Sequence, residues 1–241
     1  MRSTDAHAAV QRLMWHAPQA GGRGPKRSLT TQQIAATTVR IADADGLRSV
    51  SMQRVAAELG VTKMALYRYV PGKAGLVAIA VEEAVGEAPP NSALPSGWRP
   101  GLEAWARQLR AVWLAHSWLP GATVGDRSIG PRELTWIECP LGVLAPTRLQ
   151  AAGRFDVVLI LLGHVRNTTA VGAAGTRPWS ATGSVGSAVH HHLQDHRDTF
   201  PNLLTSLSGI PTGDGLPDRS WELGLCLLLD GLQAKIDDLT P

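Results

Sequence analysis

The chain has 241 residues, 44% of them hydrophobic, so it is long enough to bury a sizeable core and to form two domains. Two cysteines are too few for a disulfide framework, and the longest apolar run, residues 157–162, is far too short to span a bilayer. The formal net charge is +3, but residues 1–80 hold eleven Lys/Arg and four Asp/Glu, whereas residues 81–241 hold twelve and sixteen. Positive charge is therefore concentrated in the first third of the chain, which suits contact with a polyanion.

The sequence favours a soluble protein. Residues 1–20 lack a continuous apolar core, so no signal peptide is expected. A basic surface also suits an anionic membrane, but the sequence contains no amphipathic anchor and no lipidation signal. We therefore expect a cytoplasmic protein that has no membrane partner.

Residues 1–28 end in GGRGPKRS and are predicted to form a flexible basic arm. The apolar residues Val10, Leu13, Met14 and Trp15 are consistent with a short helix over residues 8–15. Two interpretations of the arm stay open: it lies along DNA phosphates or in a minor groove, or it is a tail with no specific role.

A helix is predicted to begin after Thr30, because TTQQ has the spacing of a capping box. The pair Asp45–Gly46 is predicted to end it. Its expected inner face consists of Ile34, Ala35, Val39, Ile41 and Ala42.

The string SMQRVAAELGVTKMALYRYVPGK follows, and it predicts two short helices over residues 52–59 and 63–70. Ser51 and Thr62 stand where an N-cap oxygen is needed, and Gly60 can adopt the positive φ that ends the first helix.

Apolar pairs around the two caps indicate how the helices enter and pack. Val50 with Val55, and Val61 with Leu66, have the spacing of hydrophobic staples. The expected inner face is Val55, Leu59, Val61 and Leu66, with the small Ala56 where the helices cross. The side chains left facing outward are Lys63, Met64, Tyr67, Arg68 and Tyr69. Two tyrosines beside an arginine and a lysine are typical of a helix that reaches phosphates and base edges in a major groove.

Residues 30–85 resemble the N-terminal domain of the tetracycline repressor (TetR) family. The resemblance rests on the string VAAELGVTKMALYRYVPGKAGLVAIAV, in which a lysine follows LYRYV by three residues, and on the order of three helices followed by a fourth from Lys73. The alternative is a helical hairpin with no role in nucleic-acid binding, but such a hairpin needs no exposed aromatic and basic tip.

The resemblance implies DNA contacts along this motif. The implied DNA-contacting residues are Ser51, Gln53, Thr62, Lys63, Met64, Tyr67, Arg68, Tyr69 and Lys73. Arg68 is expected to read a guanine edge and Met64 a thymine methyl group, whereas the tyrosines and Lys73 are expected to anchor on phosphates. The family often has histidine or phenylalanine at the Tyr69 position.

The predicted DNA-binding domain spans residues 29–86, and the proline-rich stretch GEAPPNSALPSGWRP marks its boundary. Residues 87–241 read as a second, all-helical domain, so the expected fold class is all-α. The expected helices cover residues 101–117, 131–145, 153–173, 185–195 and 219–238, with further short helices near 147–151 and 201–207.

Two predicted helices, 153–173 and 219–238, are apolar on nearly every side and must be covered on both. In the TetR family, helices at these positions form a four-helix bundle across a two-fold axis. The resemblance therefore implies a homodimer that reads a palindromic operator. The alternative is a monomer in which both helices are central.

The family also implies a small-molecule effector held in the second domain. Aromatic walls with a few polar groups favour such a pocket, and the candidate residues are Trp113, His116, Trp136, His164 and Asn167. The alternative is that these side chains are ordinary core or interface residues with partners of their own.

No catalytic, cofactor or metal site is expected. The sequence contains no GxSxG, Walker A, CxxC or HExxH motif. His190, His191, His192 and His196 adjoin a Gly/Ser-rich loop, which favours a solvated turn over a metal site. The sequence thus predicts a ligand-responsive repressor rather than an enzyme. Two alternatives stay open: a DNA-binding protein that responds to no ligand, and an enzyme that uses the second domain's pocket.

Overall fold

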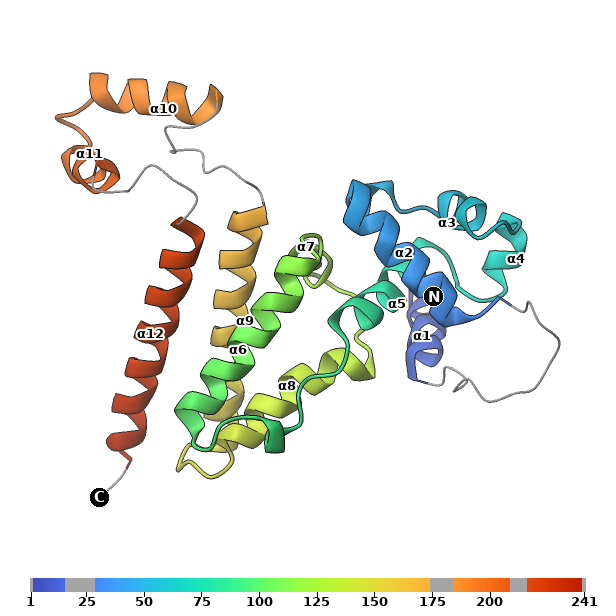
Figure 1. The fold of residues 1–241 in the computed structure, drawn as a ribbon, viewed down its shortest axis with the longest axis horizontal. Coiled ribbons are helices and arrows are strands. Elements are labelled where there is room, and N and C mark those ends of the chain that lie inside the picture. The colour runs from blue at the N-terminus through green and yellow to red at the C-terminus, as the bar shows by residue number, and fades with distance from the viewer. Residues whose placement is uncertain (1, 16–28, 174–183, 209–215, 240–241) are drawn as a thin grey trace. The chain divides into compact units, whose positions relative to one another are not determined.

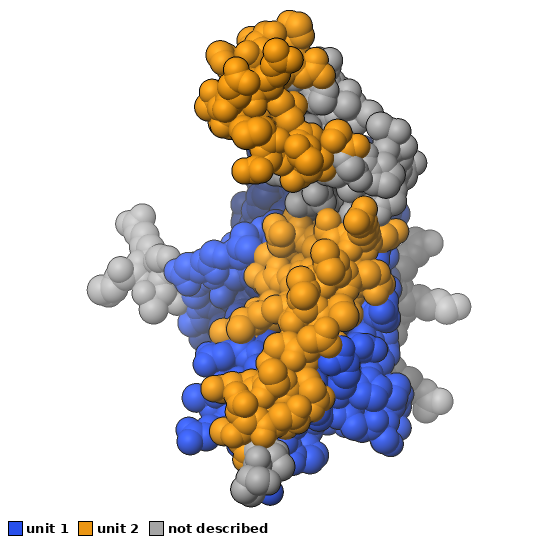
Figure 2. All heavy atoms as spheres, turned by 90° about the vertical axis from the view of Figure 1, so that its left-hand side faces the viewer, with its two compact units in different colours: residues 1–158 blue, residues 159–241 orange. Residues whose placement is uncertain are grey.

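The computed structural model describes residues 2–15, 29–173, 184–208 and 216–239, and within these ranges every regular element is a helix (Figure 1). The all-α fold class is confirmed for the described part of the chain. The chain divides into two compact units, Met1–Val158 and Leu159–Pro241, and the division falls inside one long helix (Figure 2).

The first helix, α1 (Arg2–Trp15), packs on α5 (Lys73–Val85) and buries Val10 and Met14. It is six residues longer at its start than the predicted helix over residues 8–15. The beginning of the expected arm is thus a packed helix, whereas residues 16–28 of the predicted arm lie outside the described residues.

The second helix, α2 (Thr31–Asp45), begins at the predicted capping box. The Thr30 hydroxyl accepts from the Gln33 amide at 3.1 Å, and the Gln33 side chain accepts from the Thr30 amide at 3.0 Å. The predicted inner face was wrong at one position. Val39 is half-buried, whereas Thr38 is fully buried because its hydroxyl donates to the Ile34 carbonyl at 2.7 Å.

The helix-turn-helix consists of α3 (Met52–Glu58) and α4 (Lys63–Tyr67), which follow a single 3-10 turn, η1 (Leu47–Ser49). The second helix of the motif is three residues shorter than predicted. Residues 68–70 form a turn, because Pro71 disfavours helical geometry at Val70.

Beyond α5 the chain passes through η2 (Asn91–Ala93) and then forms α6 (Trp98–Ala115), α7 (Leu119–Ala122) and α8 (Pro131–Leu144). Helices α6 and α8 were predicted within three residues at each end, whereas α7 was not predicted. The short helix expected near residues 147–151 does not form; the chain turns there, and the next helix begins at Ala151.

The remaining helices are α9 (Ala151–Ala173), α10 (Ser184–Asp195), α11 (Pro201–Ser208) and α12 (Leu216–Asp237), which confirm the predicted order. Within the second unit, α9 packs on α12: the His164 ring stacks on Trp221 at 5.1 Å, and its Nε2 lies 3.0 Å from the Trp221 carbonyl oxygen. Large apolar side chains are nevertheless exposed on both helices: Leu159, Ile160, Leu223 and Leu227.

No helix in the described ranges is both long and apolar enough to cross a membrane. Cys139 is buried, and burial raises the pKa of its thiol. Cys226 is exposed on α12, with its Sγ 3.3 Å from Asp230.

Candidate nucleic-acid interface

The helix-turn-helix is fixed by its own caps. The Ser51 hydroxyl accepts from the Arg54 amide at 3.2 Å, and the Thr62 hydroxyl accepts from the Ala65 amide at 3.1 Å. Each hydroxyl uses its oxygen as an acceptor for the cap, so its hydrogen stays available to donate to a phosphate oxygen. Gly60 takes φ +66 in the turn between the helices, which a residue with a Cβ rarely adopts.

The inner side of the motif is closely packed. Val50, Val55 and Leu66 have no exposed surface, and Ala56 is buried where the helices meet. Leu59 and Val61, expected on the same face, are only half-buried. The short helices therefore hold their orientation through apolar contacts, because elements of five and seven residues are too short to be stable alone.

All the residues predicted to contact DNA are exposed. Met64 is 75% exposed, the largest fraction among the exposed large hydrophobic side chains of the described residues. The Lys63 ammonium lies 5.8 Å from the centre of the Tyr67 ring, a distance compatible with a cation–π contact. Lys63, Arg68 and Lys73 form no ion pair with another described residue, so their charges are available to phosphates or base edges.

Two other arginines of this region face carboxylates instead. Arg40 of α2 pairs with Glu58 of α3 at 2.8 Å, and Arg54 of α3 pairs with Asp45 at the end of α2. The hydrogen bond and charge of Arg40 lower the pKa of Glu58. These exposed pairs contribute little energy each, but together they connect α3 to α2 at both ends of the shorter helix.

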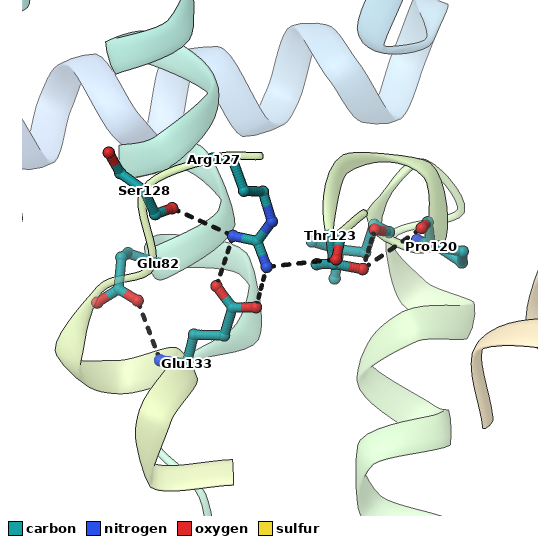
Figure 3. Close-up of polar contacts among 7 residues, drawn as sticks. Glu82, Pro120, Thr123, Arg127, Ser128 and Glu133 are labelled. Carbon is teal, nitrogen blue, oxygen red and sulfur yellow. Dashed lines mark hydrogen bonds and ion pairs between the residues drawn. The ribbon is translucent and has the colours of Figure 1, made fainter. Parts of the chain in front are cut away.

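A buried carboxylate connects α5 to α8 (Figure 3). Glu82, 8% exposed, accepts from the backbone N–H groups of Arg132 at 2.9 Å and Glu133 at 3.0 Å. These N–H groups belong to the first turn of α8, whose N-cap residue is Gly130 and has no side chain to satisfy them. Burial raises the pKa of Glu82, although the two backbone donors act in the opposite direction. Glu82 therefore caps α8 from another helix.

A second layer of polar contacts surrounds this joint. Arg127 donates to Glu133 through both terminal nitrogens and to the Ser128 carbonyl at 3.3 Å (Figure 3). Arg132 pairs with Glu83, the residue after Glu82, at 3.1 Å. The start of α8 is therefore connected to two successive residues of α5.

A different carboxylate connects α2 to the end of α6. Asp43 Oδ1 accepts from the Trp118 indole Nε1 at 2.7 Å and lies 2.9 Å from His116 Nδ1. The signal for the joint between α5 and α8 was present but unused: Glu82 and Glu83 interrupt an otherwise apolar helix, and buried polar groups require partners.

The candidate effector residues divide between the two units, with Trp113, His116 and Trp136 in the first and His164 and Asn167 in the second. His116 contacts Asp43, and the Trp136 indole donates to the Val85 and Gly86 carbonyls at 3.1 and 3.2 Å. Trp113 is buried on α6. His164 and Asn167 lie in the second unit, where His164 contacts Trp221 and Asn167 is exposed.

The histidine-rich segment lies on α10 and the turn after it. His191 Nε2 is 3.8 Å from Asp195, and His192 and His196 are exposed. Among the residues that the structure describes, no three or more His, Cys, Asp or Glu side chains are placed to hold a metal ion.

Comparison with known proteins gives one family over most of the chain. Residues 34–79 match the family model of the bacterial regulatory proteins, tetR family, and residues 90–236 match that of the tetracyclin repressor-like C-terminal domain. The HTH-type transcriptional repressor DrrR1 of Streptomyces coeruleorubidus is 36% identical over 168 residues, which cover 69% of this chain and 60% of DrrR1. The match thus spans less than two thirds of DrrR1.

Two further relatives are similar over nearly the whole chain. An HTH-type transcriptional regulator of Saccharopolyspora erythraea is 27% identical over 92% of this chain and 91% of its own length. The crystal structure of the TetR family protein ActR of Streptomyces coelicolor in complex with (S)-DNPA is 25% identical, has a TM-score of 0.72, and covers 87% of this chain and 100% of ActR. From these matches and its helix-turn-helix, the chain belongs to the TetR family of transcriptional regulators.

Proposed function

We propose that this regulator is a ligand-responsive repressor that binds a palindromic operator as a homodimer. The observation that carries the proposal is the exposed row on α4 and the turn after it, where unpaired basic side chains alternate with aromatic and apolar ones. DNA-binding would use residues 29–86, and dimerisation and effector binding would use residues 87–241. The ranges of the two matching family models support this division.

In the proposed complex, α4 lies in a major groove. Arg68 reads a guanine edge and Met64 contacts a thymine methyl group, while Tyr67, Tyr69 and Lys73 anchor on phosphates. Further contacts to DNA come from Lys63, Gln53 and the hydroxyls of Ser51 and Thr62. A dimer places its two recognition helices about 34–36 Å apart, in successive major grooves. Binding over a promoter would then block polymerase. A protein with this role would work in the cytoplasm, where the DNA is.

The dimer would form through α9 and α12. Leu159 and Ile160 on α9, and Leu223 and Leu227 on α12, are exposed apolar residues within one compact unit. A two-fold axis beside these helices would cover them with the same residues of a second copy. Coverage of this kind explains why both helices are apolar on more than one side.

The effector would be a small, apolar or aromatic molecule, and the ActR structure that contains (S)-DNPA supports this class of regulation. A ligand that fits the DNA-free shape better than the DNA-bound shape shifts the dimer toward release. The connecting helix α5 would transmit the change by separating the two recognition helices. Trp113 of α6 and Asn167 of α9 stay candidates for contact with the effector. Equal ligand affinity for the free and the operator-bound dimer would contradict this mechanism.

The first experiment is selection from a random duplex DNA library with the full-length protein at near-physiological salt. Recovery of one palindrome supports a dimeric, sequence-specific regulator and supplies the probe for finding its effector by release. Recovery of no preferred sequence, with binding that disappears as salt rises, would leave only backbone electrostatics and would overturn the proposal.

A further inference from the structure

We propose that Asp43 is a positioning residue. By holding the end of α6 against α2, it fixes the orientation in which α4 meets DNA. The inference rests on the proposed function. It assigns to α2 a connection that is separate from the path along α5.

The contact joins one acceptor to two donors at a corner of the fold. Asp43 Oδ1 accepts from Trp118 Nε1 at 2.7 Å and lies 2.9 Å from His116 Nδ1. His116 is the C-cap residue that follows α6 and Trp118 is the residue before α7, so the carboxylate holds the two helices where they meet. Trp118 is only 6% exposed, so its indole cannot easily exchange this partner for water.

An open groove adjoins this contact. Asp43 and His116 border the groove, and its apolar lining comes from small side chains of α2 and α5: Ala36, Val39, Ala44 and Ala84. Hydrogen bonds are directional, so the two polar contacts of Asp43 constrain how the end of α6 lies against α2. A displacement of α6 by about 1 Å would already stretch both contacts beyond good hydrogen-bond distance.

Any such displacement reaches the DNA-binding motif through α2. Asp43 lies two residues before the end of α2, and Asp45 at that end pairs with Arg54 of α3. Arg40, one turn earlier, pairs with Glu58 at the other end of α3. The end of α6 is thus connected through α2 to the helix that supports α4.

The expected effect of losing the contact follows from pre-organisation. Without it, α2 and the motif sample more orientations, so a smaller fraction of the protein is competent to bind both half-sites, and the apparent dissociation constant rises in proportion. Simple electrostatics predicts the reverse, because removing an acidic charge from a DNA-binding protein tightens its binding. Weaker operator binding by the variant therefore indicates a loss of positioning, whereas tighter binding indicates only the loss of a negative charge.

The test compares the wild-type protein with the variants Asp43→Asn, Asp43→Ala and Trp118→Phe. For each protein, the affinity for the palindromic duplex recovered by selection is measured and corrected for the active fraction. Trp118→Phe keeps an aromatic ring but removes the indole donor together with part of the buried side chain. We expect Asp43→Ala and Trp118→Phe each to weaken operator binding by about tenfold, as for one lost charged hydrogen bond, and their combination to be no worse than either alone. Asp43→Asn keeps one acceptor and should weaken binding less.

Two control variants match the chemistry elsewhere. Trp15→Phe removes an exposed indole donor that bonds to Gln11 at 3.0 Å, and Glu87→Gln removes an exposed acidic charge after α5. Neither should weaken operator binding. Affinity for a random duplex at low salt should not fall in any variant. Unchanged or tighter operator binding by Asp43→Ala or Trp118→Phe, or fully additive losses, would overturn the proposal. Failure to recover any duplex would instead refute the proposed function.

Discussion

Removing the Glu82 carboxylate tests whether α5 caps α8. Glu82→Ala takes the acceptor away from two N–H groups of the first turn, and neither Gly130 nor Pro131 offers a side chain in its place. Losing a helix N-cap costs about 0.5–2 kcal/mol, and because burial raises the pKa of Glu82, its charge adds no stability at neutral pH. We expect the free energy of unfolding to fall by about 1–2 kcal/mol, and the melting temperature by about 2–8 °C.

Glu82→Gln separates the hydrogen bonds from the charge. The amide oxygen can keep one of the two backbone bonds, and the side chain has no charge to desolvate. The expected loss is therefore below about 1 kcal/mol at neutral pH. Thermal unfolding followed by circular dichroism compares both variants with the wild-type protein.

The pH dependence has a defined sign. Because burial raises the pKa of Glu82 above the ordinary value of a glutamate, the folded state binds this proton more tightly than the unfolded state. The associated stability is present below the unfolded pKa and is lost as pH rises through the folded pKa. Acidification from neutral pH toward 4.5 should therefore stabilise the wild-type protein relative to Glu82→Gln. Equal melting temperatures for Glu82→Ala and Glu82→Gln would refute the reasoning. So would a loss of wild-type stability relative to Glu82→Gln on acidification.

Arg68→Ala should relax operator preference at one base pair by about 1–3 kcal/mol, whereas Lys73→Ala should weaken all sequences alike and flatten the salt slope; equal effects on every duplex would contradict these roles. Gly224→Ala should lower the melting temperature, because the added Cβ would lie 2.2 Å from the His164 ring. A normal melting curve would exclude this close packing. Leu227→Glu should shift sedimentation from dimer to monomer, because it places a charge in the proposed interface; an unchanged dimer would place the interface elsewhere.

The DNA-binding motif was largely predictable because its signals are local. Each cap and each staple joins residues no more than five apart, so the sequence alone places α2, α3 and the start of α4. The end of α4 was placed too late, although Pro71 already disfavoured helical geometry at Val70.

The partners of the candidate effector residues were not predictable, because they are far away in the chain. Trp136 donates to a carbonyl 51 residues earlier, and His116 meets Asp43 across 73 residues. The pattern of an amphipathic helix shows that such a side chain faces inward, but not whether it meets a ligand, a backbone carbonyl or a carboxylate. Residues chosen as pocket candidates only because they face inward on a helix therefore include some whose role is to connect helices.

The carboxylates of Asp43 and Glu82 both act on the pair of helices α2 and α5. Helices α2 and α5 pack on each other through buried residues that include Ile34, Ile41 and Leu76, so they move together. Asp43 attaches this pair to α6, and Glu82 attaches it to α8. With one joint broken, the other still limits rotation of the DNA-binding motif.

The double variant Asp43→Asn, Glu82→Gln should therefore weaken operator binding by more than the product of the single losses, because the motif then loses both restraints on its rotation. Binding of the selected duplex by the folded fraction of each variant measures this coupling. Strictly multiplicative losses would mean that the two joints act independently, each restraining the motif without help from the other.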